Sequence, residues 1–161
     1  MLGLKRARRA KPGDIGRVQV DENCWANMQY LGEHEYFGPA VLIYPKLTND
    51  IGEVIRGDQL KSYVMFYLFP DFVKDGLVEI VGHQPPDREV PVITRQRQVI
   101  TRTVVPCKTW IIVDAAGQRT FRDNLTDEEL DIPERAIFCH ADLIKRLLNG
   151  WQPIDDVIRT A

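Results

Sequence analysis

Alternation of apolar and polar residues predicts strands in the first half of the chain. Residues 15–20 alternate strictly, as expected of a strand with one buried face. Residues 25–31 resume the apolar pattern after a polar turn, and residues 40–44 form an apolar run that Pro45 closes, which is typical of a buried strand. Residues 12–14 have the sequence of a turn, so we expect the folded part to begin there.

The segment from Gln59 to Phe69 fits two kinds of element. Its apolar residues lie at the spacing of a helical face, yet residues 63–69 are also continuous and aromatic, like a buried strand. Periodicity does not separate the two at this length. We expect Pro70 to end either element, because proline lacks a backbone donor and disrupts a helix interior.

The middle of the chain predicts further strands. They are expected at 77–81, 99–105, 110–114 and 119–122. The last two flank a turn that contains Gly117 and so predict a β-hairpin, while Gly82 is expected at the end of the first. Trp110 and Ile112 should share one face, because residues two apart in a strand point to the same side.

The last third of the chain predicts helices. Thr126 followed by Glu129 forms a capping-box sequence, and residues 131–133 offer another helix start with proline in the first turn. An apolar stripe at 143–148 precedes Gly150, which suits a residue just past a helix end. The expected fold class is therefore α+β: a mostly antiparallel sheet or small barrel closed by C-terminal helices.

Length and composition place the chain among ordinary globular proteins. Its 161 residues suit one domain, and 44% hydrophobic with 27% charged residues excludes a collagen-like or wholly disordered chain. We expect a basic, flexible arm at 1–11 and a single α+β domain at 12–161. No apolar run approaches the roughly 20 residues that span a bilayer, and no apolar stretch of a secretory signal follows the basic start. The expected location is the cytoplasm, with no membrane partner.

Residues suited to catalysis or metal binding are sparse. Cys24, Cys107 and Cys139 are too far apart for a disulfide framework or a zinc site, so we expect reduced, buried thiols. The sequence has no HExxH, phosphate-binding loop or serine-nucleophile motif. We predict no catalytic residue, no metal and no cofactor. A small enzyme that uses Cys139 with His140, or His83, remains an alternative, because a thiolate needs a base nearby.

Charge is distributed unevenly although its balance is nearly neutral. Twenty-one basic and 23 acidic residues give a net charge of -2, which argues against a general nucleic-acid-binding domain. A nucleic-acid-binding β-barrel would use the basic arm with Arg95, Arg97 and Arg102.

Acidic residues dominate positions 114–134, directly after a basic block at 88–108. The two blocks either pair with each other, which would contribute little stability, or form a surface that steers a charged protein partner. For the second interpretation, the candidate partner-binding residues are Asp127, Glu128, Glu129 and Asp131.

Parts of the chain resemble the immunity protein 26 family of bacterial polymorphic toxin systems. The resemblance covers about half of the chain and is carried by Lys11-Pro12-Gly13-Asp14-Ile15, the aromatic segment ending near Phe69, Leu77–Gly82 before Pro85-Pro86, and Trp110–Asp114 with Gly117. This chain departs from the family by lacking an aromatic residue in the strand before Gly82. The resemblance implies a mainly β protein that binds a cognate toxin directly, and it supplies no catalytic residues. We therefore expect a cytoplasmic bacterial immunity protein that occludes a toxin's active site.

Overall fold

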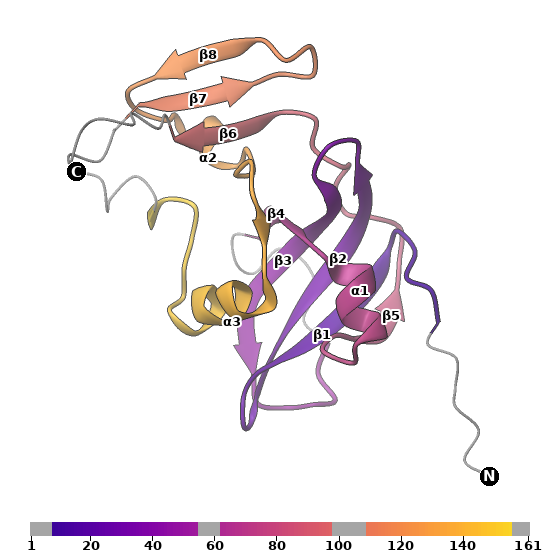
Figure 1. Cartoon of the computed structure of the whole chain (residues 1–161). Coiled ribbons are helices and arrows are strands. Elements are labelled where there is room, and N and C mark those ends of the chain that lie inside the picture. The colour runs from indigo at the N-terminus through magenta and orange to yellow at the C-terminus, as the bar shows by residue number, and fades with distance from the viewer. Residues whose placement is uncertain (1–7, 55–61, 98–108, 156–161) are drawn as a thin grey trace.

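Two β-sheets and three helices make up the part of the chain that the computed structural model describes, residues 8–54, 62–97 and 109–155 (Figure 1). The six-stranded sheet has the order β5 (Glu79–His83), β1 (Asp14–Asp21), β2 (Cys24–His34), β3 (Gly38–Thr48), β4 (Tyr63–Tyr67) and β9 (Ile137–Phe138). The three-stranded sheet has the order β6 (Thr94–Arg97), β7 (Trp110–Val113) and β8 (Arg119–Arg122). The helices are α1 (Phe69–Lys74), α2 (Asp127–Leu130) and α3 (His140–Leu148).

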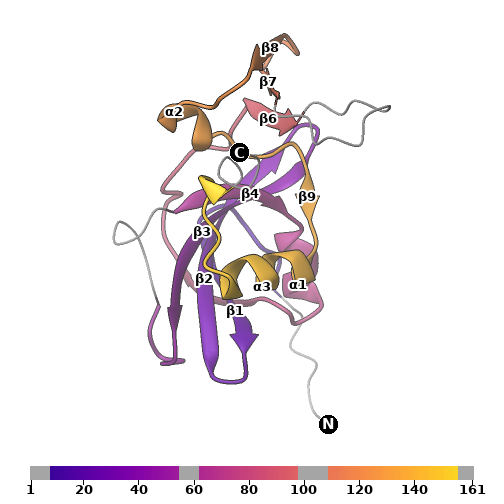
Figure 2. The same ribbon diagram turned by 90° about the vertical axis from the view of Figure 1, so that its left-hand side faces the viewer.

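The fold class is α+β with mostly antiparallel sheets. Every strand pair is antiparallel except β4 with β9, so the strands predicted in the first half and the hairpin at 110–122 are confirmed. The described residues form no closed barrel, and closure by C-terminal helices is not confirmed, because α2 is a single turn beside the smaller sheet. Figure 2 shows the smaller sheet at one end of the larger one. The predicted strand at 99–105 lies outside the described residues.

Strand β4 explains why its sequence suited two elements. Tyr63, Met65 and Tyr67 join the cluster on one face of the sheet. Val64 and Phe66 join the cluster on the other face. A strand buried on both faces has no polar positions to reveal a period of two, so its sequence is a continuous apolar run.

Several boundaries differ from the sequence prediction. Strand β3 runs through Pro45 to Thr48 instead of ending at that proline. Pro70 does not end the secondary structure but lies in the first turn of α1, where a missing N–H is tolerated. Strand β5 runs through Gly82 to His83 instead of ending there. The predicted helix start at 131–133 is wrong: Asp131 is the C-cap of α2, and the chain beyond it is extended.

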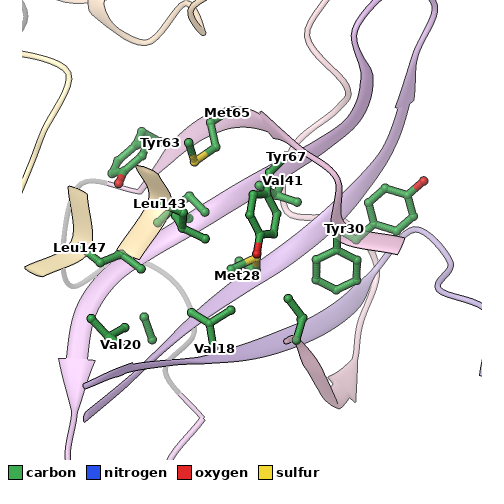
Figure 3. Close-up of a cluster of buried hydrophobic side chains, with 14 of the residues drawn as sticks. Val18, Val20, Met28, Tyr30, Val41, Tyr63, Met65, Tyr67, Leu143 and Leu147 are labelled. Carbon is green, nitrogen blue, oxygen red and sulfur yellow. The ribbon is translucent and has the colours of Figure 1, made fainter. Parts of the chain in front are cut away.

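Helices α1 and α3 cover one face of the six-stranded sheet. Leu143 and Leu147 of α3 are buried against the sheet beside Val18 and Val20 (Figure 3). At α1, the ring of Phe69 stacks on Tyr30 with 5.3 Å between the ring centroids. The burial of Leu143 and Leu147 accounts for the apolar stripe that predicted α3.

One extended segment hydrogen-bonds to both sheets. The backbone N–H of Arg95 in β6 donates to the carbonyl of Pro133, and the N–H of Arg135 donates to the carbonyl of Arg95. A few residues later, β9 pairs in parallel with β4. The segment 133–138 therefore fixes the smaller sheet beside the larger one.

Candidate partner-binding surfaces

The predicted acidic residues lie on and beside α2, whose start is held by a capping box. The Thr126 hydroxyl accepts a hydrogen bond from the backbone N–H of Glu129, and the Glu129 carboxylate accepts one from the N–H of Thr126. This arrangement satisfies two of the N–H groups that a helix start leaves unpaired. The capping prediction is confirmed, and it fixes the orientation of a very short helix.

Glu129 has a structural role within this group. Arg122 Nε donates to the Glu129 carboxylate at 2.9 Å. The backbone hydrogen bond from Thr126, aided by Arg122, lowers the pKa of Glu129 below 4.5. A carboxylate engaged in these bonds is less free to meet a partner than its neighbours are.

Asp127, Glu128 and Asp131 are exposed, and none of their three carboxylates forms a hydrogen bond or ion pair with another described residue. Asp127 and Asp131 also line a surface cleft of about 370 Å³. Its other lining residues include Arg88, Gln152, Pro153 and Ile154. We call Asp127, Glu128, Asp131 and this cleft the acidic surface.

The basic block does not form a continuous exposed surface in the part of the chain that is described. Arg95 is only 1% exposed, and its Nε donates to the carbonyl of Ile132 at 2.7 Å. The guanidinium groups of Arg95 and Arg97 lie 4.6 and 5.0 Å from the centre of the Trp110 ring. Arg95 thus stabilises the join between β6 and the segment after α2 instead of facing solvent, and Arg102 lies outside the described residues.

A second cleft, of about 430 Å³, opens between the β2–β3 hairpin tip and the β7–β8 turn. The hairpin contributes residues 33–37, the turn contributes 113–117, and Arg135 lies on the segment that joins the sheets. Val90, Val92 and Thr94 complete the lining. We call this the hairpin cleft; its lining residues come from four separate parts of the sequence, and no pattern in the sequence connects them.

The three histidines all use Nδ1 in local contacts. His34 Nδ1 accepts the backbone N–H groups of Tyr36 and Phe37, and His140 Nδ1 lies 2.7 Å from the Tyr67 hydroxyl. Burial lowers the pKa of both imidazoles below 6.5. His83 Nδ1 lies 2.9 Å from the buried carboxylate of Asp14.

Cys139 and His140 do not contact each other through their side chains. The Cys139 thiol donates to the Asp142 carboxylate at 3.1 Å, while the imidazole turns to Tyr67. The prediction of buried thiols is wrong for Cys139, which is exposed at the N-cap of α3, and Cys24 is half-buried. Cys107 lies outside the described residues.

The N-terminal arm is attached to the domain where it is described. Arg8 donates to Asp14 at 2.8 Å, and the backbone N–H of Lys11 donates to the same carboxylate. Asp14 is fully buried, so these bonds and His83 compensate for the loss of its hydration. Of the predicted flexible arm, residues 8–11 thus lie against β1.

Comparison of the chain with protein-family models, curated proteins and solved structures finds no match. Within the described ranges, no helix is long and apolar enough to cross a membrane.

Proposed function

We propose that this chain binds a protein partner through the acidic surface, and that it acts as a cytoplasmic immunity protein covering the active site of a cognate bacterial toxin. One observation carries the proposal: three exposed carboxylates without partners among the described residues stand on a turn that a capping box fixes. Carboxylates held in place before binding lose little freedom when a partner arrives.

The charge of this surface indicates the chemistry of the partner. Asp127, Glu128 and Asp131 outnumber Arg88, the basic residue that lines the same cleft, and so create a negative potential that accelerates encounter with a basic surface. The cleft beside them offers space for an apolar anchor, because Pro153 and the 41% exposed Ile154 line it. A basic toxin surface, such as the substrate-binding face of an enzyme that cleaves nucleic acid, would complement both features.

The two alternatives receive less support from the described residues. A nucleic-acid surface built on Arg95 conflicts with the burial of that side chain. An enzyme using Cys139 with His140 conflicts with their separate hydrogen bonds to Asp142 and Tyr67. Catalysis by His83 would require a nucleophile near the Asp14–His83 pair, and no described thiol or serine hydroxyl hydrogen-bonds to His83.

Co-expression tests the proposal. The reading frame beside the gene for this chain is expressed in a bacterial host with and without this chain, and survival and complex formation are measured. We expect the neighbouring product to arrest growth, this chain to restore it, and the two to co-purify. Asp127→Lys with Asp131→Lys should abolish rescue, whereas Thr126→Ser should preserve it because the capping hydroxyl remains. Growth arrest that this chain does not relieve would contradict the immunity function.

A further inference from the structure

The hairpin cleft carries a second recognition feature that the sequence did not indicate. One wall is held by local contacts: the N–H groups of Tyr36 and Phe37 both donate to His34 Nδ1, at 3.0 and 3.3 Å, and Phe37 packs on Phe66 with ring centroids 5.1 Å apart. Tyr36 is nevertheless 74% exposed. A large aromatic ring presented to solvent on a fixed loop is typical of a binding anchor.

The opposite wall presents a fixed carboxylate. Asp114 Oδ1 accepts the backbone N–H groups of Ala116 and Gln118, both at 2.9 Å, and Gly117 takes the positive φ of 77° that this turn requires. One carboxylate oxygen of Asp114 is thereby bonded to the turn, and the other forms no hydrogen bond with another described residue.

The cleft has a negative charge. Glu33, Glu35 and Asp114 oppose one guanidinium, that of Arg135, which leaves a net charge of -2 with His34 neutral. Burial keeps His34 neutral at pH 7, because it lowers the imidazole pKa below its usual 6.5. The surroundings therefore favour a cation over an anion.

Arg135 and Thr94 add two features to this cleft that are independent of its carboxylates. The guanidinium of Arg135 already lies over the Phe37 ring, 5.3 Å from its centroid, so the chain itself places a cation on an aromatic face of this cleft. Thr94, which is only 3% exposed, lines the cleft, and its hydroxyl forms no hydrogen bond with another described residue.

We propose that the hairpin cleft receives a positively charged side chain, arginine or lysine, from the protein partner. This inference rests on the proposed function and names a contact on the same partner. The exposed Tyr36 ring offers a second aromatic face for the charged head, and Glu35 and Asp114 neutralise it. Val90, Val92 and Val113 line the cleft where the methylene stem would lie.

Nuclear magnetic resonance titration of the full chain tests the cleft without the partner. The probe is the capped peptide Gly-Gly-Arg-Gly-Gly, and the matched control contains citrulline, which has the shape of arginine without its charge. We expect millimolar arginine peptide to shift the amide signals of residues 34–37 and 114–117, and the citrulline peptide to leave them in place. Tyr36→Ala should weaken binding about two- to fivefold, the effect of losing one exposed cation–π contact, and Tyr36→Phe should not.

Three outcomes would overturn the proposal. One is an equal response to the arginine and citrulline peptides, and another is the absence of shifts at these residues. The third is binding of free arginine as tight as that of the peptide, which would indicate a small-molecule site.

If the arginine peptide does not bind while Asp127→Lys with Asp131→Lys still abolishes rescue from the toxin, the cleft assignment is wrong and the proposed function stands. If the peptide binds but no toxin is neutralised, the proposed function fails instead.

Discussion

Trp110 lies at the centre of the smaller sheet, with Arg95 and Arg97 on its ring. It is 3% exposed, and Ile111 and Val113 of the same strand are buried as well. We predict that Trp110→Ala lowers the free energy of unfolding by about 3–5 kcal/mol, as for other buried aromatic residues. Urea denaturation followed by circular dichroism measures the change.

The control for this prediction is Phe121→Ala on the adjacent strand, where the side chain is 55% exposed. An exposed substitution of this kind should change stability by about 0.5 kcal/mol or less. A loss below about 1 kcal/mol for Trp110→Ala would show that the Trp110 ring contributes little to the core.

His140 makes stability depend on pH. Burial lowers its folded-state pKa below the ordinary 6.5, so the unfolded chain takes up a proton first as the pH falls. The stabilisation from burying the neutral imidazole is therefore complete at pH values well above 6.5. It is lost as the pH decreases through the folded-state pKa. We predict that unfolding becomes easier as the pH falls below about 6.5 and that His140→Gln flattens this slope.

Urea denaturation at a series of pH values measures the slope for His140. His34 shifts in the same direction, so the His140→Gln variant should retain part of the dependence and His34→Gln with His140→Gln should retain less. A slope that is unchanged in the double variant would mean that carboxylates, not these imidazoles, set the pH dependence.

At the scale of single elements, α2 depends on one hydroxyl. Thr126→Ala removes the cap from a helix of only four residues, and we predict a loss of about 1 kcal/mol. Thr126→Ser is the matched control, since it keeps the hydroxyl. Equal stability of both variants in urea would contradict a structural role for the capping box.

The contact between β1 and α1 depends on a glycine. A Cβ at Gly16 would lie 2.5 Å from the Phe69 ring and 2.7 Å from Val78. Gly16→Ala should therefore cost about 1–3 kcal/mol through overpacking. Gly52→Ala, which meets only the Asp50 carboxylate at 3.3 Å, is the control, and a thermal shift of the same size in both variants would refute the packing argument.

Local sequence signals predicted the elements that depend on them. The alternation in β1, the Gly117 turn and the Thr126 cap are each determined by a few consecutive residues, and each was predicted. The extended segment after Asp131 was missed, because its backbone is held by β6 and β4, which are distant in sequence. Pro133 favours a helix start when the sequence is considered alone, because the strands that bind this segment are not evident from it.

At the scale of the whole molecule, the candidate surfaces required the fold. The acidic residues were predicted as a block, but only the structure separates Glu129, bonded to Arg122, from the three carboxylates that are exposed. The hairpin cleft was not predictable at all, because it joins residues near 34, 92, 114 and 135. The segment 133–138 holds the two sheets together and so positions both surfaces.

The most direct test of the account is the rate at which this chain associates with the product of the neighbouring reading frame, measured by stopped flow at several salt concentrations. If the acidic surface steers the partner, Asp127→Lys with Asp131→Lys should slow association about tenfold or more at low salt and flatten its salt dependence. The control is Asp71→Lys with Asp75→Lys, which makes the same change of charge at two exposed positions, one in α1 and one at its C-cap. It should change the association rate much less. An association rate and salt dependence identical to those of the unmodified chain would contradict the account.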